Sequence, residues 1–267
     1  MSRSTTPQRI SPALLTALTA LVTAALWGCS AAWAQERGRP AQPTLPSWSV
    51  GVFASTETSP YRGADNDNRL LPVLAFENRY VRLAGPMIDF KLPSAGAMTY
   101  SLRARYSLEG YEASDSASLA VMAERKGGIW LGAKADWRLP LATLSTEWMG
   151  DANGRSGGHQ IGLIAEKTLR MGGVILAPRA ALRWQDSNYV DYYFGVRNNE
   201  TSPGRAAYAG KSGVNTELGL RAIYAFSSQQ SVFMDVQTTA LSSAVTKSPL
   251  VDRNWVSALR LGYAYRF

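Results

Sequence analysis

The 267-residue sequence predicts an all-β protein: an antiparallel transmembrane β-barrel of about 12 strands that follows a cleaved signal peptide. Three observations predict this fold. The chain begins with a secretory signal. Apolar and polar residues then alternate over segments close to the 9–11 residues that a transmembrane strand needs. The connections between these segments alternate between short and long, as they do in outer-membrane barrels.

Residues 1–34 have the parts of a secretory signal peptide. Arg3 and Arg9 form a basic start, and an uncharged apolar run from Ala13 to Gly28 follows. The run is shorter than the roughly 20 residues of a membrane-spanning helix. The small-x-small pattern that ends at Ala34 predicts cleavage after that residue. The letters LWGC also resemble a lipoprotein site, so lipidation at Cys29 remains the alternative.

Cleavage after Ala34 changes the chemistry of the mature chain. It removes Cys29, the only cysteine, so the mature protein has neither disulfides nor thiolate metal sites. The formal net charge falls from +8 to +6, because two arginines leave with the signal. The secretion signal and the lack of basic runs argue against a nucleic-acid partner. We expect residues 35–46 to be a Pro-rich lead-in and residues 47–267 to form the barrel.

Period-2 alternation predicts strands with two different faces. In one segment Leu102 belongs to the apolar face and Arg103 to the polar face, and in another Leu220 and Arg221 divide in the same way. About twelve segments show the pattern: 47–56, 68–78, 79–91, 97–108, 117–126, 128–139, 141–149, 158–169, 172–185, 212–226, 230–241 and 254–267. We expect the leucines to face outwards and the arginines to face the interior.

A soluble barrel or sandwich and a membrane barrel could both use this alternation. The soluble fold buries its apolar face inside, whereas the membrane barrel turns that face to lipid. Aromatic residues near strand ends favour the membrane barrel, because such residues occupy membrane–water interfaces. These residues are Trp48, Trp184, Trp255, Tyr263, Tyr265 and Phe267.

Loop lengths also favour the membrane barrel. Short links at 170–173 and 227–230 alternate with long ones at 57–67, 150–157, 186–211 and 242–253. Short periplasmic turns and long outer loops are the outer-membrane pattern. If both chain ends lie in the periplasm, the strand number is even. Twelve strands fit best, and ten remain the alternative because 109–116 is long for a periplasmic turn.

The chain ends on an aromatic residue of an alternating strand. The apolar positions of this strand are Leu259, Leu261, Tyr263, Tyr265 and Phe267. The last strand must pair with the first, because unpaired backbone groups are costly in lipid. The pattern resembles the signal that the outer-membrane barrel assembly machinery reads, which makes that machinery an expected partner.

Several blocks of sequence together resemble the MltA-interacting protein (MipA)/OmpV family of Gram-negative outer-membrane proteins. The blocks are SPYRGADNDNRLLPVLAFENRYVRLAG (59–85), GYEASDSASLAVMAERKGG (110–128), DANGRSGGHQIGL (151–163), DSNYVDYYFGVRNNE (186–200), GRAAYAGKSGVN (204–215), KSPLV (247–251) and the closing GYAYRF. They span nearly the whole mature chain in the family's order. Ala207 departs from the pattern, which has proline before the tyrosine.

The resemblance implies a lipid-embedded outer-membrane barrel that is not an enzyme. It implies a scaffold between a murein hydrolase and a murein synthase, with no cofactor. Other members of the family are described as porin-like or as adhesive surface antigens. A small-solute pore or a surface adhesin is therefore the alternative function.

Basic residues gather on the predicted interior face. They are Arg103, Arg105, Lys134, Arg138, Arg179, Arg183, Arg221, Arg260 and Arg266. The interior acids are fewer: Glu124, Asp136, Glu166, Glu217 and Asp235. We expect an ion-paired, plugged interior, because a barrel of this size lies between filled eight-stranded barrels and open porins. The alternative is a narrow pore that favours anions.

Two further segments were tested as candidate sites. His159, the only histidine, follows Asp151 and Ser156, which are the residue types of a catalytic triad. The surrounding glycines favour an ordinary turn, and one histidine without a mature cysteine provides no metal site. The longest loop carries Tyr189, Tyr192, Tyr193 and Phe194, which would suit either an outer recognition surface or a lid folded into the barrel mouth.

Overall fold

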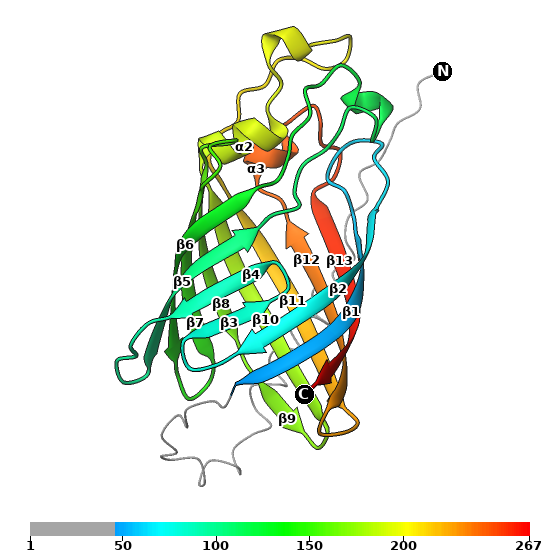
Figure 1. Cartoon of the computed structure of the whole chain (residues 1–267). Coiled ribbons are helices and arrows are strands. Elements are labelled where there is room, and N and C mark those ends of the chain that lie inside the picture. Colours follow the sequence, from blue (N-terminus) through cyan, green and yellow to red (C-terminus); the bar gives the residue numbers. More distant parts are fainter. Residues whose placement is uncertain (1–45) are drawn as a thin grey trace, which may run out of the picture. The chain divides into compact units, whose positions relative to one another are not determined.

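The computed structural model describes residues 46–267, so the predicted signal peptide and nearly all of the lead-in lie outside the described residues. The described chain is built mainly of antiparallel strands (Figure 1). The strands are β1 (Ser47–Glu57), β2 (Asp67–Glu77), β3 (Val81–Ala84), β4 (Met87–Lys91), β5 (Met98–Tyr106), β6 (Ile129–Arg138), β7 (Thr143–Asp151), β8 (His159–Glu166), β9 (Leu169–Met171), β10 (Val174–Gln185), β11 (Gly213–Ala225), β12 (Gln230–Ala240) and β13 (Trp255–Arg266).

Four short helices lie in the connections between strands. They are η1 (Ala117–Leu119), α2 (Ser187–Phe194), η2 (Asn198–Glu200) and α3 (Ser243–Thr246). All four belong to long connections at one end of the barrel, which we call the loop end; the opposite end is the turn end (Figure 1). Within residues 46–267, no helix has both the length and the apolar character that crossing a membrane requires.

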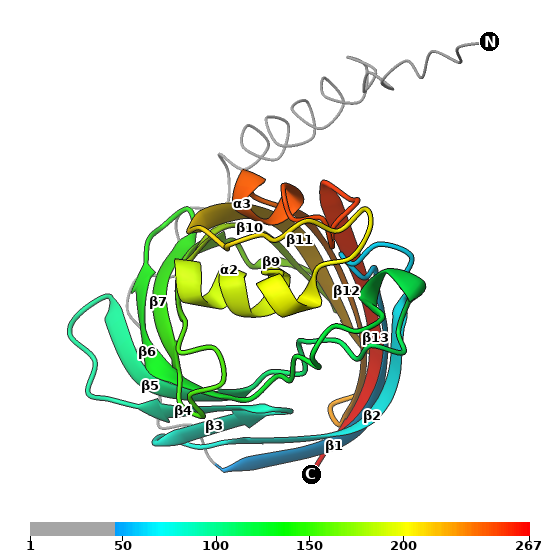
Figure 2. The ribbon, with the colours of Figure 1, turned by 90° about the horizontal axis from the view of Figure 1, so that it is seen from above.

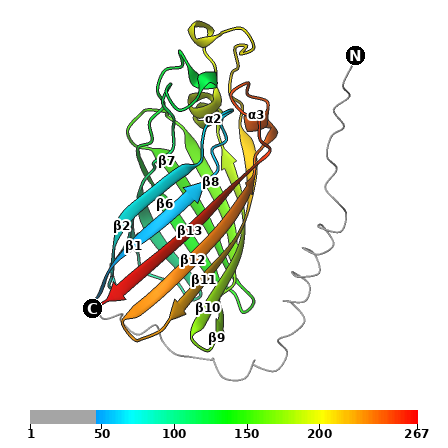
Figure 3. The same cartoon turned by 90° about the vertical axis from the view of Figure 1, so that its right-hand side faces the viewer.

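The sheet closes on itself into a barrel. β1 pairs with β13 from Ser49↔Arg266 to Glu57↔Ala258, and the two strands run side by side in Figure 3. β8 and β9 both pair with β10, one after the other, so they occupy one position in the wall. The barrel is therefore a closed antiparallel cylinder of twelve strands, as the sequence predicts.

The two faces of the wall separate apolar from polar side chains. Leu102 and Leu220 point outwards and are 50% and 41% exposed, whereas Arg103 and Asp235 point inwards and form ion pairs. The outward surface is thus almost wholly apolar, which is the inverse of a soluble barrel. This arrangement matches the face assignment predicted from the alternation.

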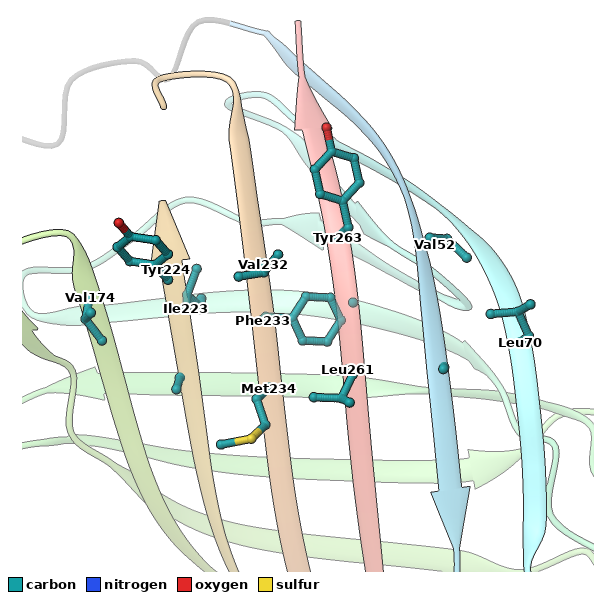
Figure 4. A pocket seen from close by; sticks show the side chains of 13 residues that line it. Val52, Leu70, Val174, Ile223, Tyr224, Val232, Phe233, Met234, Leu261 and Tyr263 are labelled. Atoms are coloured by element: carbon teal, nitrogen blue, oxygen red, sulfur yellow. The ribbon is translucent and has the colours of Figure 1, made fainter. Parts of the chain in front are cut away.

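An apolar hollow of 530 Å³ lies on this outward surface (Figure 4). Val52, Met234 and Leu261 line it, and Phe233 of β12 lies beside Gly262, its partner on β13. Gly262 makes room for this ring, because a Cβ there would lie 2.2 Å from Phe233. In a bilayer an acyl chain fills such a surface.

Two predicted strands are wrong, although the total of twelve is right. Residues 79–91 form the β3–β4 hairpin instead of one strand, with the chain turning at Gly85 (φ 56°) and Pro86. Residues 117–126 form no strand; they are η1 and part of a loop at the loop end. The stretch 109–116 belongs to that same loop, which removes the argument for ten strands.

The β3–β4 hairpin is short, and it leaves part of β2 without a second neighbour. β2 pairs with β3 only from Ala75 to Glu77, and the hairpin tip reaches β2 through a bond from the Gly85 amide to the Leu74 carbonyl (3.2 Å). Among the described residues, no strand pairs with the remaining outer edge of β2. Pro72 fits this edge, because it has no amide hydrogen to offer a partner.

Candidate functional site

The interior carries the charges that the sequence places there. Asp235 on β12, buried at 1% exposure, accepts from Arg179 at 2.7 and 2.9 Å. Arg221 also donates to Asp235 at 2.9 Å, and Arg260 lies 3.4 Å from both Asp235 and Glu57. One buried carboxylate thus gathers three guanidinium groups from three strands. Charge-assisted bonds of this kind satisfy a carboxylate that burial would otherwise penalise.

Like Asp235, Glu147 on β7 is a carboxylate that binds more than one arginine; we call these two carboxylates and their partners the two hubs. Arg103 bonds to Glu147 and also binds Asp89 through two bonds of 2.7 and 2.9 Å. Arg183 lies 3.4 Å from Glu147 and 2.7 Å from Glu217. A ladder of alternating charge therefore follows the inner wall from β4 to β11. Such a ladder neutralises the middle of the barrel.

All six arginines singled out from the sequence line the interior. Arg103, Arg179, Arg183, Arg221 and Arg260 belong to the two hubs. Arg105 donates to Gln160 at 3.0 Å. Of the predicted interior acids, Glu124 is misplaced: it lies in the loop 107–128 and pairs with Lys126.

Asp89 and Glu147 were missed as partners of these arginines. Asp89 fell inside the segment mistaken for one strand. Glu147 had a usable signal, because it alternates with the outward residue Trp148 and so had to face the interior.

A hydrophobic core fills part of the loop end. Helix α2 lies inside the ring of strands when the barrel is seen from above (Figure 2). The Asp186 carboxylate caps this helix by accepting from the Tyr189 amide at 2.8 Å. We call the buried set the mouth core: Tyr61, Tyr111, Leu119, Met122, Trp130, Met149, Tyr189, Val190, Tyr193, Phe194, Val196, Val245, Leu250 and Val251.

The aromatic residues of the longest loop are packed into this core. Tyr189, Tyr193 and Phe194 are 4%, 3% and 8% exposed, and Tyr192 is half-buried. Tyr189 donates to Glu109 at 2.8 Å, which ties α2 to the loop 107–128. Inward packing corrects the expectation of an outer recognition surface made from these four side chains. The geometry is that of a lid folded into the barrel mouth. We use the word lid for the loops 107–128 and 186–212 together.

A buried ion pair joins two loops of the lid. Arg125 donates to both oxygens of Glu200 at 2.9 and 3.0 Å, and each side chain is 2% exposed. Arg125 also donates to the Tyr192 carbonyl at 2.7 Å. Arg205 donates to the Glu200 carbonyl at 2.9 Å and reaches the carbonyls of the loop 107–128. The loops 107–128 and 186–212, which are far apart in sequence, are locked together here.

The environment of the lid shifts two pKa values in opposite directions. Burial raises the pKa of Glu200, but bonds from the Arg197 amide, the Arg125 guanidinium and the Ala123 amide outweigh it, so this pKa lies below its ordinary value of 4.5. Burial raises the pKa of Tyr111 to about 12. At neutral pH Glu200 is therefore charged and Tyr111 is neutral.

The triad candidate is not assembled. Ser156 donates to Asp151 at 2.9 Å, and the amides of Ser156 and Gly157 bond to the same carboxylate at 2.6 and 3.0 Å. His159 instead points outwards and stacks on Trp148, with ring centroids 5.7 Å apart. Asp151 and Ser156 therefore form a turn, the alternative weighed from the sequence. Within residues 46–267, no three His, Cys, Asp or Glu side chains gather as metal ligands.

The C-terminal strand keeps its apolar residues on the outward face. Leu259, Leu261 and Tyr263 are 36%, 47% and 36% exposed, and Phe267 is 71% exposed. The Phe267 amide donates to the Trp48 carbonyl at 2.9 Å, so pairing with β1 continues to the last residue. Tyr265 packs edge-on against Phe267. The seam between β1 and β13 thus ends on Phe267.

Removing Phe267, or changing it to Asp, should leave the protein secreted but poorly inserted and degraded in the periplasm. The expected cause is loss of a terminal aromatic that we expect the assembly machinery to read. Migration on unboiled gels, where folded barrels run differently from boiled ones, measures the inserted fraction. A Phe267→Tyr variant is the matched control and should insert normally. Normal insertion of the Asp variant would contradict the assembly role.

The free edge of β2 borders a polar hollow of 720 Å³ at the loop end. Its lining includes Asp67 and Arg69 at the start of β2 and Glu109 and Tyr111 in the loop 107–128. Arg69 donates to the Leu108 carbonyl at 3.2 Å, so the two sides of the hollow touch. Polar groups therefore reach a stretch of β2 that has no second strand partner among residues 46–267.

Comparison with known proteins agrees with this architecture. Residues 50–267 match the family model described as MltA-interacting protein MipA. The MltA-interacting protein of Escherichia coli is 26% identical over 223 residues, which cover 82% of this chain and 90% of the relative. Outer membrane protein Omp26La of Vibrio anguillarum is 30% identical over 157 residues, covering 58% of this chain and 61% of the relative.

A solved outer-membrane channel from Pseudomonas putida aligns with 86% of this chain and all of its own, at 12% identity and a TM-score of 0.43. Relatives named as outer-membrane proteins place this barrel in the outer membrane. The loop end then faces outwards and the turn end faces the periplasm. The family match covers nearly all of the described barrel, and the chain belongs to the MltA-interacting protein (MipA) family.

Proposed function

We propose that this protein is a non-enzymatic outer-membrane scaffold that holds a murein hydrolase and a murein synthase at the cell wall. The name of the Escherichia coli relative supports a partner among wall enzymes. The observation that carries the proposal is the lid: a mouth core locked by the buried Arg125–Glu200 pair lies across the loop end. Such a lid suits an anchor more than a permeation path.

A small-solute pore that favours anions is the second candidate. Its support is the accessibility of part of the interior: the Arg221 side chain is 47% exposed and that of Arg260 is 31% exposed. Both residues point inwards, so water reaches the interior charges. An adhesin has less support, because the loop aromatics are buried in the mouth core.

Conductance and protein capture separate the two candidates. For a scaffold, the purified protein should give no stable channels in planar bilayers, and it should capture a murein hydrolase from solubilised envelopes. The Arg125→Met variant, in which the lid is weakened, is measured beside the wild-type protein. Channels in both proteins without any captured wall enzyme would overturn the scaffold in favour of the pore. Channels only in the variant would show that the lid closes the barrel.

A further inference from the structure

Four arginines at the turn end share one local pattern. Each is the inward residue between two apolar neighbours near the periplasmic end of its strand. The four are Arg82 between Val81 and Leu83, Arg138 between Trp137 and Leu139, Arg170 between Leu169 and Met171, and Arg266 between Tyr265 and Phe267. We call this set the periplasmic arginine ring.

Pairing across strands shows that the ring faces the interior. Arg82 lies opposite Asp89, the inward residue that binds Arg103. Arg170 lies opposite Ile175, which shares the inward face of β10 with Arg179. Arg138 lies opposite Thr143, and Arg266 opposite Ser49, on the inward faces of β7 and β1. The apolar neighbours therefore point to lipid and the guanidinium groups point into the mouth.

The ring spreads around the whole mouth. Along the sheet, Arg82 on β3 lies three strands from Arg266 on β13, and Arg138 on β6 lies three strands further. Arg170 follows two strand positions later, on β9. Charges of one sign arranged around an opening with low-dielectric walls focus the field and raise the local concentration of the opposite charge.

The ring differs from the arginines in the middle of the barrel because it has no ionic partners among the described residues. Within residues 46–267, none of its four guanidinium groups forms an ion pair, and all four residues are exposed. The acids nearest to Arg82 are occupied: Glu77 pairs with Lys91 and Asp89 with Arg103.

The charge balance of the turn end is positive as a whole. The turns and strand ends at 77–82, 91–97, 138–143, 166–173, 226–230 and 266–267 hold seven Lys or Arg residues. They hold two Glu residues and the terminal carboxylate. One of these acids, Glu166, lies on the inward face opposite Arg179. The excess of unpaired positive charge thus lies at the periplasmic mouth.

We propose that the periplasmic arginine ring binds extended peptides that carry several free carboxylates, with the stem peptides of the cell wall as their source. The ring lies inside the mouth, so it suits a slender chain that enters the opening better than a broad protein surface. Guanidinium groups match carboxylates in geometry and keep their charge at every physiological pH. The choice of the cell wall as the source of the peptide rests on the proposed function. The choice of carboxylates as the ligand does not, because it rests on the arginines of the ring.

Binding of a fluorescently labelled murein stem peptide, measured by anisotropy in neutral detergent, tests the proposal. The wild-type protein should bind the peptide and should not bind the same peptide with its carboxylates amidated. Changing all four ring arginines to Gln should weaken binding at least about tenfold, because it removes the four positive charges that concentrate anions at the mouth. Changing them to Lys keeps the charge but loses the guanidinium geometry, so the affinity should lie between that of the wild type and that of the Gln variant.

The matched control removes the same number of charges from the loop end. It changes Arg62, Lys211, Lys247 and Arg253 to Gln, all of which are exposed. This variant should bind the peptide like the wild type, whereas about 1 M salt, with a Debye length of about 3 Å, should abolish binding by every variant. Migration on unboiled gels verifies that each variant is folded.

Equal binding by the wild type and the Gln ring variant would overturn the proposal, as would equal losses in the ring and loop-end variants. A free oligoglutamate that binds much more tightly than the stem peptide would overturn the wall as the source. Capture of a murein hydrolase by the same preparations separates the peptide-binding proposal from the proposed scaffold function. Peptide binding without hydrolase capture removes only the scaffold, and hydrolase capture without peptide binding removes only the ring site.

Discussion

Replacing Leu220 with arginine should destabilise the barrel by about 2–4 kcal/mol, the range for a basic residue on the lipid face near the bilayer midplane. Leu220 lies in the middle of β11, points outwards and is 41% exposed. The measurement is the free energy of unfolding in urea, after refolding into the same lipid vesicles. A loss of less than about 1 kcal/mol would show that this face does not contact hydrocarbon.

Arg221→Ser, one position further, is the matched control. Its side chain is 47% exposed, and Asp235 keeps Arg179 and Arg260 when it is removed. The cost should therefore stay below about 1 kcal/mol, as for an accessible ion pair. Arg103 would be a poor control, because its loss leaves Asp89 without its ion pair and Glu147 with only Arg183, and these two carboxylates are 9% and 4% exposed. If Arg221→Ser costs as much as Leu220→Arg, the face assignment is wrong.

Arg125→Met should destabilise the lid by about 3–5 kcal/mol, because it leaves the Glu200 carboxylate buried without its cation. The variant also loses the bond to the Tyr192 carbonyl. Amide hydrogen exchange of residues 186–212 measures the opening of the lid, and exchange of β11 and β12 reports whether the barrel itself stays folded. Lid exchange at the wild-type rate would contradict the role of this pair.

The neighbouring Lys126→Met variant is the control for the lid. Lys126 pairs with Glu124, but these side chains are 58% and 41% exposed, so the loss should remain below about 1 kcal/mol.

Lowering the pH should destabilise the lid in the same way as the Arg125→Met substitution. Because the folded-state pKa of Glu200 is lowered, its contribution is fully present at neutral pH. It disappears as the pH falls below the ordinary value of 4.5 and through the lowered pKa.

The alternation of side chains predicted the barrel and its faces well, because lipid imposes that pattern on every spanning strand. It failed for 117–126, where Leu119 and Met122 are apolar because the mouth core buries them. An apolar residue at alternate positions reports burial or lipid contact, and it does not by itself report a strand. The segment 79–91 carried a local signal in Gly85-Pro86, a dipeptide typical of turns.

The lid could not be derived from the sequence in the same way. Arg125 and Glu200 are 75 residues apart, and no periodicity links them. The interior arginines were predictable one by one, because each alternates with an outward residue. Their acid partners depend on register, so Asp89 was lost with the misassigned hairpin. Local patterns determine which way a side chain points, whereas the pairing of distant loops depends on packing that one sequence does not reveal.

The free edge of β2 gives the barrel a distinct side in the plane of the membrane. The Leu74 carbonyl points towards the hairpin, so Asn68 and Leu70, at even spacing along the same strand, direct their backbone groups to the same side. In hydrocarbon each unsatisfied group costs several kcal/mol. The polar hollow beside this edge places Asp67 and Arg69 next to these groups at the loop end.

The unpaired backbone groups of this edge change how the barrel fits into the outer leaflet. Lipids beside Asn68 and Leu70 meet backbone groups without a strand partner among the described residues, whereas those beside β11, β12 and β13 meet an unbroken apolar wall. The energy of the surrounding membrane therefore depends on the angle around the barrel axis. In a crowded outer membrane the barrel therefore has one side with unpaired backbone groups and one side that is apolar throughout, and neighbouring lipids and proteins will not pack equally well against the two.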